Sequence, residues 1–220
     1  MVHPRSDTAT LEVLPAEARP WEEDQRIVIH GGVTWDQYEA VRAALDHIAG
    51  LRMTYIDGAL EIMSPGRRHE GVKKLVARLV ELYAFEMDID LNGYGSMTFG
   101  KKAKKRGLEP DECWTVGEMP TQKSKEYPEI AFEVVITSGG LDKLDAYQGL
   151  GVPEVWFWQH GRFSIHRLGR RGYEAVQRSR FLPGLDFHLL ESLIEKGGRQ
   201  IEILRTFRDL IVRARKPKKR

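Results

Sequence analysis

Ile130-Ala131-Phe132-Glu133-Val134-Val135-Ile136 is an apolar run interrupted by a single carboxylate. Because both faces of the run are apolar, it predicts a central β-strand that other elements cover on both sides. Alternation along this strand puts Glu133 on the same face as the small Ala131. A carboxylate there costs several kcal/mol unless a cation or a hydrogen-bond donor compensates it. This favours a functional site, and the alternative is a structural carboxylate paired with an arginine.

A second acidic group comes before that run, in Glu109-Pro110-Asp111-Glu112. Pro110 favours an extended entry to Asp111, and Cys113-Trp114-Thr115-Val116 then predicts a further strand. Two carboxylates one strand apart suit a hard cation such as Mg²⁺, which lowers the pKa of a bound water and polarises a phosphodiester oxygen. The alternative for Asp111 is a turn residue, since Pro-Asp is a common turn dipeptide.

Lys143 follows Glu133 by ten residues and lies on a short predicted helix. Its i+4 neighbour Tyr147 and the later Leu150 belong to the apolar stripe of that helix, so Lys143 borders the buried side. A lysine there can reach back over the strand end, where it would hold the attacking hydroxide or neutralise charge at the phosphorus. The alternative is a surface lysine whose aliphatic stem packs on apolar residues.

His69 and Glu70 begin a long predicted helix after the break at Ser64-Pro65-Gly66. By helical phase His69 lies near the apolar stripe, whereas Glu70 falls on the opposite side. Both are candidate site residues. The alternatives are a partly buried packing histidine and a glutamate that interacts favourably with the helix N-terminus. The apolar stripe of this helix comprises Val72, Leu75, Val76, Leu79, Val80 and Tyr83.

The remaining segments predict an α/β protein with a mixed β-sheet core flanked by helices. Thr34 caps a first helix that Gly50 ends. Two strand-like runs around Asp57-Gly58 predict a β-hairpin. Asp57 is therefore interpreted as a turn residue, whereas Glu61 and Glu112 are interpreted as surface charges.

Length and composition predict one domain of an ordinary globular kind. The chain has 220 residues, a net charge of +2 and a single cysteine, Cys113. We expect a flexible arm over 1–26, the folded domain over 27–207 and a basic tail over 208–220. One cysteine excludes an intramolecular disulfide and favours a reducing cytoplasm. We find no signal peptide, and no apolar run approaches the roughly 20 residues that span a bilayer.

Two basic clusters are candidates for contacts with phosphates. One is interpreted as a loop that follows the predicted turn Asn92-Gly93-Tyr94-Gly95 and a short strand, and the other is the end of the tail, residues 213–220. The alternative for each is a solvated loop or tail. The first cluster comprises Lys101, Lys102, Lys104, Lys105 and Arg106.

Several short motifs occur in order along residues 34–190: Tyr55-Ile56-Asp57-Gly58, Met63-Ser64-Pro65, His69, Pro110-Asp111, Phe132-Glu133-Val134-Val135, Lys143 with Tyr147, and Gly151-Val152-Pro153-Glu154-Val155-Trp156. As an ordered set they resemble the Uma-type family of bacterial endonucleases. That family belongs to the restriction-endonuclease-like PD-(D/E)xK superfamily. The resemblance implies a restriction-endonuclease-like fold and cleavage of DNA that depends on Mg²⁺ or Mn²⁺.

The resemblance also implies roles for individual residues. Asp111 and Glu133 would bind the metal, and Glu70 on the helix would complete the site. In the superfamily the lysine normally stands two residues after the second acid, where this chain has Val135. The Uma-type family resembles members in which the lysine has moved to the following helix, and Lys143 fits that place.

Three functions remain open at this point. The leading one is a Mg²⁺-dependent DNA endonuclease. The second, which Val135 motivates, is a catalytically silent nucleic-acid-binding or regulatory module of the same fold. The third is a metal-dependent hydrolase of another substrate, since a fold alone does not fix function. Cutting both strands of DNA would favour a homodimer.

Overall fold

The computed structural model describes residues 22–117, 127–136 and 140–215. Its helices are α1 (Trp35–Leu45), α2 (Arg67–Glu86), the 3-10 turn η1 (Lys102–Lys104), α3 (Lys143–Leu150), α4 (Phe187–Lys196) and α5 (Gln200–Arg215). Its strands are β1 (Gln25–Ile29), β2 (Arg52–Ile56), β3 (Ala59–Ser64), β4 (Leu91–Gly93), β5 (Phe99–Lys101), β6 (Arg106–Leu108), β7 (Glu112–Val116), β8 (Ile130–Val135), β9 (Glu154–Gln159), β10 (Arg162–Gly169) and β11 (Gly172–Val176).

These strands form two sheets. The larger sheet has six strands in the order β11-β10-β9-β8-β7-β4, and the smaller has five in the order β1-β3-β2-β6-β5. Within the larger sheet β8 pairs parallel with β9 and antiparallel with β7, so this sheet is mixed. The mixed sheet with its helices confirms the expected α/β class and agrees with a restriction-endonuclease-like fold.

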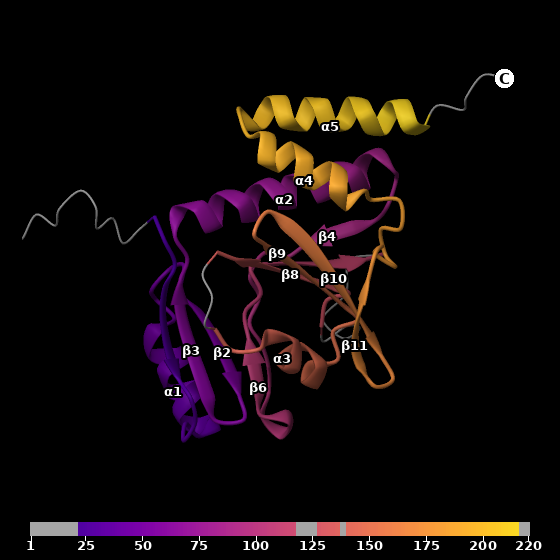
Figure 1. Cartoon of the computed structure of the whole chain (residues 1–220). Coiled ribbons are helices and arrows are strands. Elements are labelled where there is room, and N and C mark those ends of the chain that lie inside the picture. Colours follow the sequence, from indigo (N-terminus) through magenta and orange to yellow (C-terminus); the bar gives the residue numbers. More distant parts are fainter. Residues whose placement is uncertain (1–21, 118–126, 137–139, 216–220) are drawn as a thin grey trace, which may run out of the picture.

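Strand β8 lies inside the larger sheet and is covered on both faces, as its apolar sequence predicts. Ile130, Phe132 and Val134 pack in the main core together with side chains of α2, α4 and α5. Ala131 belongs instead to a second cluster with side chains of α3. Figure 1 shows α2, α4 and α5 on one side of this sheet and α3 on the other. The face that carries Glu133 is therefore the face that α3 covers.

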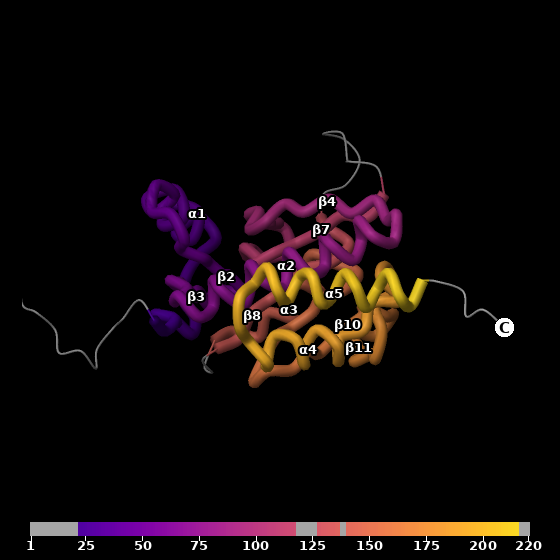
Figure 2. Tube along the Cα trace, turned by 90° about the horizontal axis from the view of Figure 1, so that it is seen from above, coloured from indigo at the N-terminus to yellow at the C-terminus, as the bar shows by residue number. Residues whose placement is uncertain are grey.

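The smaller sheet packs against α1 through its own apolar cluster, which contains Tyr38 and Tyr55. These two rings stack with centroids 5.0 Å apart. Helix α1 starts with a capping box at Thr34, as expected, but ends at Leu45 rather than at Gly50. Ile48 is exposed, so a further turn would bury no apolar side chain. Figure 2 shows α1, β2 and β3 to one side of α2, α4 and α5.

The two sheets meet where β6 leads into β7. Residues 109–111 connect them, so Asp111 lies at the junction. Helix α2 follows β3 of the smaller sheet and packs on the larger one, with Leu79 and Val80 fully buried. The junction thus gathers the first turn of α2, the start of β7 and the strand β8.

Some segments differ from the sequence-based expectation. Residues 92–93 belong to β4 rather than to a turn, because this segment pairs with β7 at the sheet edge. The basic segment 101–106 is a hairpin corner, β5-η1-β6, rather than an open loop. Residues 200–215 form α5, so the described part of the expected basic tail is helical, and 216–220 lie outside the described residues.

The expected flexible arm also differs in its described part. Asp24 is buried, and β1 already begins at Gln25 because it pairs with β3. Residues 1–21 lie outside the described part of the chain. Over 22–117, 127–136 and 140–215, we find no helix both long and apolar enough to pass through a bilayer.

Candidate active site

The two predicted carboxylates, Asp111 and Glu133, come together at the junction of the sheets. Strands β7 and β8 are antiparallel neighbours with Glu112 opposite Phe132, and continuing that register by one residue brings Asp111 opposite Glu133. Asp111 is 1% exposed and Glu133 is 0% exposed, so both carboxylates need internal partners. One partner of Asp111 is the Val134 N–H, which donates to Oδ2 over 2.8 Å.

The partners of Glu133 come from α3. Nζ of Lys143 donates to Oε2 over 2.6 Å, and the Tyr147 hydroxyl donates to Oε1 over 2.5 Å. Lys143 and Tyr147 are four residues apart on one helix face, which is why both reach the same carboxylate. The side chain of Asp142 caps α3 by accepting from the Leu144 N–H, so the helix begins at Lys143. Lys143 therefore points inward rather than to solvent.

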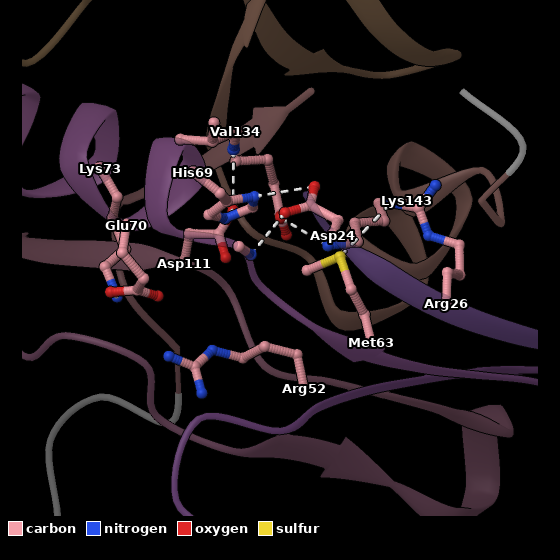
Figure 3. A network of polar contacts seen from close by, with 12 residues as sticks. Asp24, Arg26, Arg52, Met63, His69, Glu70, Lys73, Asp111, Val134 and Lys143 are labelled. Atoms are coloured by element: carbon pink, nitrogen blue, oxygen red, sulfur yellow. Dashed lines mark hydrogen bonds and ion pairs between the residues drawn. The ribbon is translucent and has the colours of Figure 1, made fainter. Parts of the chain in front are cut away.

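His69 connects Asp111 to a third carboxylate that the sequence did not suggest. Its Nε2 lies 2.9 Å from Oδ2 of Asp111, and its Nδ1 lies 3.2 Å from Oδ2 of Asp24. The ring is completely buried in the first turn of α2. Asp24 also accepts from the Gly66 N–H, which ties it to the start of that helix. Figure 3 shows the imidazole between the two carboxylates.

These contacts set the charges of the Asp111 and His69 pair. Burial opposes the ionisation of Asp111, yet His69, Lys143 and the Val134 N–H outweigh it and lower the pKa of this carboxyl from 3.8 to about 2. Burial also opposes the protonation of His69, but Asp111 and Asp24 outweigh it and raise the pKa of the imidazole from 6.5 to about 9. At neutral pH the Asp111 carboxylate is ionised and His69 is protonated, so the imidazolium forms ion pairs with Asp24 and Asp111.

Glu133 is in a different electrostatic position. Burial raises its pKa from 4.5 to about 7; the charge of Lys143 opposes this rise, and the charge of Asp111 adds to it. Burial favours the neutral form of Lys143, but Glu133 and Asp111 outweigh it and raise the pKa of the amine. Burial and Glu133 raise the pKa of Tyr147 well above its usual value, so the hydroxyl stays a donor. Glu133 can thus gain or lose a proton near neutrality while its partners do not.

One carboxylate oxygen at the junction has no hydrogen-bond partner among the described residues. Oδ1 of Asp111 is buried and has no hydrogen-bond partner among the described residues, because His69 and Val134 both engage Oδ2. Carboxylate oxygens of this kind are the preferred ligands of Mg²⁺ and Mn²⁺. Within 22–117, 127–136 and 140–215, no group of three or more His, Cys, Asp or Glu side chains is arranged to hold a metal. A cation here would therefore depend on the two carboxylates together with backbone oxygens or water.

Comparison with known protein families gives a direct match. The model of the family described as "Uma2: Putative restriction endonuclease" matches residues 35–202. This chain belongs to the Uma2 family. The match includes His69, Asp111, Glu133 and Lys143, but it begins after Asp24. None of the curated protein sequences compared with the chain matches it.

Membership of the Uma2 family supports a nuclease function and is consistent with the expected resemblance. The matched segment contains both sheets apart from β1, together with α1 to α4. Only the first turn of α5 falls within it. The carboxylate pair and the lysine of this Uma2 chain therefore lie inside the part that identifies the family, whereas the outer carboxylate Asp24 is a feature of the preceding segment.

Glu70 is not brought into the site. Its carboxylate pairs with Nζ of Lys73 over 2.5 Å, and its side chain is 43% exposed. Figure 3 shows Glu70 beside Lys73 on α2. The helical phase that separated His69 from Glu70 in the sequence holds in the structure. His69, which precedes Glu70 on α2, contacts Asp111, whereas Glu70 pairs with Lys73.

Two acids that were interpreted as surface charges are buried. Glu61 is 1% exposed, and its Oε2 lies 3.6 Å from Nε of Arg26. Glu112 is 5% exposed, and burial raises the pKa of its carboxyl. A signal for Glu61 was available, since Ala59-Leu60-Glu61-Ile62-Met63 places an acid inside an apolar run just as the segment around Glu133 does. Asp57 is a turn residue with φ of 46°, as expected.

The basic cluster lies at the corner between β5 and β6 in this Uma2 chain. Lys102 and its neighbours 104–105 are exposed there. Arg106 differs, because its side chain is only 11% exposed and its guanidinium pairs with Asp57 over 2.7 Å and with Asp145 over 2.8 Å. Arg106 therefore links β6 to α3, whereas the lysines remain available to solvent.

Proposed function

We propose that this chain is a Mg²⁺- or Mn²⁺-dependent endodeoxyribonuclease that hydrolyses phosphodiester bonds at the junction of its two sheets. The observation that carries the proposal is the convergence of two buried carboxylates, Asp111 and Glu133, with the amine of Lys143. Oxygen ligands for a hard cation and a fixed positive charge are the groups that phosphodiester hydrolysis needs. The family match supports a nuclease among the functions that this geometry could serve.

Asp111 and Glu133 would hold the cation, assisted by the backbone carbonyl near Val134. When bound, the cation would polarise a phosphodiester oxygen and lower the pKa of a water molecule. Oδ1 of Asp111 is suited to this task because its other oxygen is already engaged by His69. The carboxylate is thereby fixed in rotation, and its free oxygen is preorganised.

Lys143 would provide the positive charge for the reacting phosphate. Its amine is held 2.6 Å from Glu133 and stays protonated, so it can donate to the attacking water or to an oxygen of the phosphate in the transition state. A charge already fixed in position costs little reorganisation when the reaction occurs.

His69 would act through Asp111 rather than on DNA. Its imidazolium is completely buried between Asp24 and Asp111, with no exposed edge for a substrate. It would hold the Asp111 carboxylate in place and balance part of its charge. Glu70 as a metal ligand would require its side chain to leave Lys73 and rotate around α2, so we assign the site without it.

The exposed Lys102, Lys104 and Lys105 of the β5–β6 corner, together with the half-buried Lys101, would contact phosphates without reading sequence. The domain would occupy residues 27–207 together with Asp24, and the single cysteine favours a cytoplasmic location. Cleavage of both DNA strands would require two sites, which a homodimer would supply.

The test is cleavage of supercoiled plasmid by purified protein with Mg²⁺, with Mn²⁺ and with EDTA. We expect metal-dependent nicking that Asp111→Asn slows by about 10²-fold, the scale on which loss of one electrostatic contact in a transition state acts. Asp209→Asn is the matched control, because that carboxylate is 55% exposed on α5. Equal nicking by wild type and Asp111→Asn, or no nicking with any metal, would contradict the proposal.

Val135 motivates a second candidate, a silent nucleic-acid-binding module, because the usual lysine position carries an apolar side chain. This alternative predicts DNA binding that weakens with salt, survives Asp111→Asn and is accompanied by no cleavage. Metal-dependent cleavage by the wild type would exclude it.

A further inference from the structure

Glu61 is a buried carboxylate that the proposed reaction does not use. It lies on β3 of the smaller sheet and is 1% exposed. Its Oε2 accepts a hydrogen bond from the Leu141 N–H over 2.9 Å, across a separation of 80 residues. The same oxygen lies 3.6 Å from Nε of Arg26 on β1. One oxygen atom therefore connects two strands of the smaller sheet to the segment that enters α3.

Gly140 shows how closely that segment approaches the Arg26–Glu61 pair. A Cβ added at Gly140 would lie 2.5 Å from Oε2 of Glu61 and 3.3 Å from Cζ of Arg26. Gly140 has no positive φ, so its backbone alone does not require glycine. What excludes a side chain at this position is the ion pair packed against it.

The segment held in this way ends two residues before Lys143. Leu141 carries the hydrogen-bonded N–H, Asp142 is the N-cap of α3, and Lys143 is its first residue. A helix of eight residues has few contacts with which to fix its own start, so its entry point depends on what holds the preceding backbone.

We propose that Glu61 is a positioning residue for Lys143: it anchors the Leu141 N–H to the smaller sheet and so fixes where α3 presents its lysine to Glu133. The catalytic meaning of this role rests on the proposed nuclease function. The anchoring itself is a property of the fold and can be measured without any turnover.

The first measurement is the rate at which acetic anhydride modifies Lys143, relative to Lys102, by mass spectrometry of peptides from the full chain. The Lys143 side chain is 11% exposed and that of Lys102 is 68% exposed, so the wild type should label slowly at Lys143. Glu61→Ala removes the carboxylate that accepts from the Leu141 N–H. Gly140→Ala pushes that carboxylate away with its added methyl group and removes no polar group. Gly71→Ala is the matched control, because its added Cβ would meet nothing within 4 Å.

We expect the Lys143 to Lys102 labelling ratio to rise about fivefold or more in Glu61→Ala and in Gly140→Ala, as local opening exposes the amine. Glu61→Gln keeps an oxygen that can accept from Leu141, so its ratio should stay within about twofold of wild type. Gly71→Ala should not differ from wild type. Wild-type labelling in folded Glu61→Ala would overturn the proposal. If Glu61→Ala does not fold, Gly140→Ala answers the same question by the same criterion.

The second measurement is DNA cleavage by the same variants. A misplaced Lys143 should lower kcat by about 10- to 100-fold in Glu61→Ala, while KM for DNA changes by less than about twofold. A Glu61→Gln variant as impaired as Glu61→Ala would overturn anchoring through the hydrogen bond. Altered labelling in a chain that cuts no DNA would retain the anchoring role and refute the nuclease. DNA cleavage by variants whose labelling is unchanged would retain the nuclease and refute the anchoring role.

Discussion

Nζ of Lys143 lies 2.6 Å from Oε2 of Glu133, although the two residues are ten positions apart and belong to different elements. The amine comes from the first turn of α3, and the carboxylate comes from the middle of β8. The chain thus brings a lysine to the second carboxylate without having one two residues later in the same strand, where Val135 stands. This contact makes the assignment of Lys143 testable by substitution.

Replacing Lys143 with methionine should nearly abolish cleavage while the chain stays folded. Methionine fills much of the same space but removes the positive charge, so we expect a cleavage rate lower by about 10²- to 10³-fold. The pKa of Glu133 should rise further, because Lys143 opposes its elevation. Single-turnover plasmid cleavage measures the rate, and Lys102→Met is the exposed control. A rate within about threefold of wild type would remove Lys143 from the reaction.

A lysine at position 135 should partly rescue that variant. Residues 133 and 135 of β8 share a face by strand alternation, so a lysine at 135 would extend from the same side as Glu133. We expect Lys143→Met/Val135→Lys to cleave about tenfold faster than Lys143→Met alone. The reason is that a positive charge near the phosphate stabilises the transition state whether the lysine comes from β8 or from α3. Cleavage by the double variant no faster than by Lys143→Met would argue that the amine must come from α3.

Asp24→Asn should loosen His69 without removing the acceptor for Gly66. Asp24 is one of two carboxylates that raise the pKa of His69 to about 9, so the neutral amide should lower this pKa toward 6.5. We expect cleavage to fall by about tenfold, as for other groups that orient a metal ligand. NMR titration of the His69 ring gives the pKa, with Asp36→Asn as an exposed control. An unchanged His69 titration would contradict the assigned contact.

The metal-free protein should lose stability as the pH rises, because His69 loses its proton and with it its ion pairs to Asp24 and Asp111. The pKa of His69 is raised from 6.5 to about 9 in the folded state. A raised pKa adds stability that is fully present below about pH 6.5 and is lost as the pH rises through about 9, in total about 3 kcal/mol. Urea unfolding of wild type and His69→Gln in EDTA, from pH 6 to pH 10, measures the difference. Parallel stability curves for the two proteins would show that His69 does not titrate as described.

The sequence predicted the inner part of the site because each signal there is local. Glu133 stands inside its own apolar run, and Lys143 and Tyr147 are four residues apart on one helix. Periodicity alone therefore placed the acid inside the sheet and the lysine beside the buried stripe. The same helical phase separated His69, which contacts Asp111, from Glu70, which does not.

The outer part could not be predicted, because its contacts are long in sequence. Asp24 reaches His69 across 45 residues, and Glu61 reaches Leu141 across 80. Asp24 was interpreted as part of a flexible arm because residues 1–26 are rich in Pro, Glu, Asp and Thr. Its burial results from the pairing of β1 with β3 and from the N-terminus of α2. The apolar run around Glu61 signals a buried acid, but the partners of Glu61 and Asp24 become visible only in the fold.

The claim that Asp111 and Glu133 together bind a divalent cation is tested most directly by anomalous X-ray diffraction from crystals soaked in Mn²⁺. Manganese scatters anomalously and takes oxygen ligands as Mg²⁺ does. We predict an anomalous peak between the Asp111 and Glu133 carboxylates in the wild type and none in Asp111→Asn crystals. Crystals that bind Mn²⁺ elsewhere but show no peak between these carboxylates would contradict it.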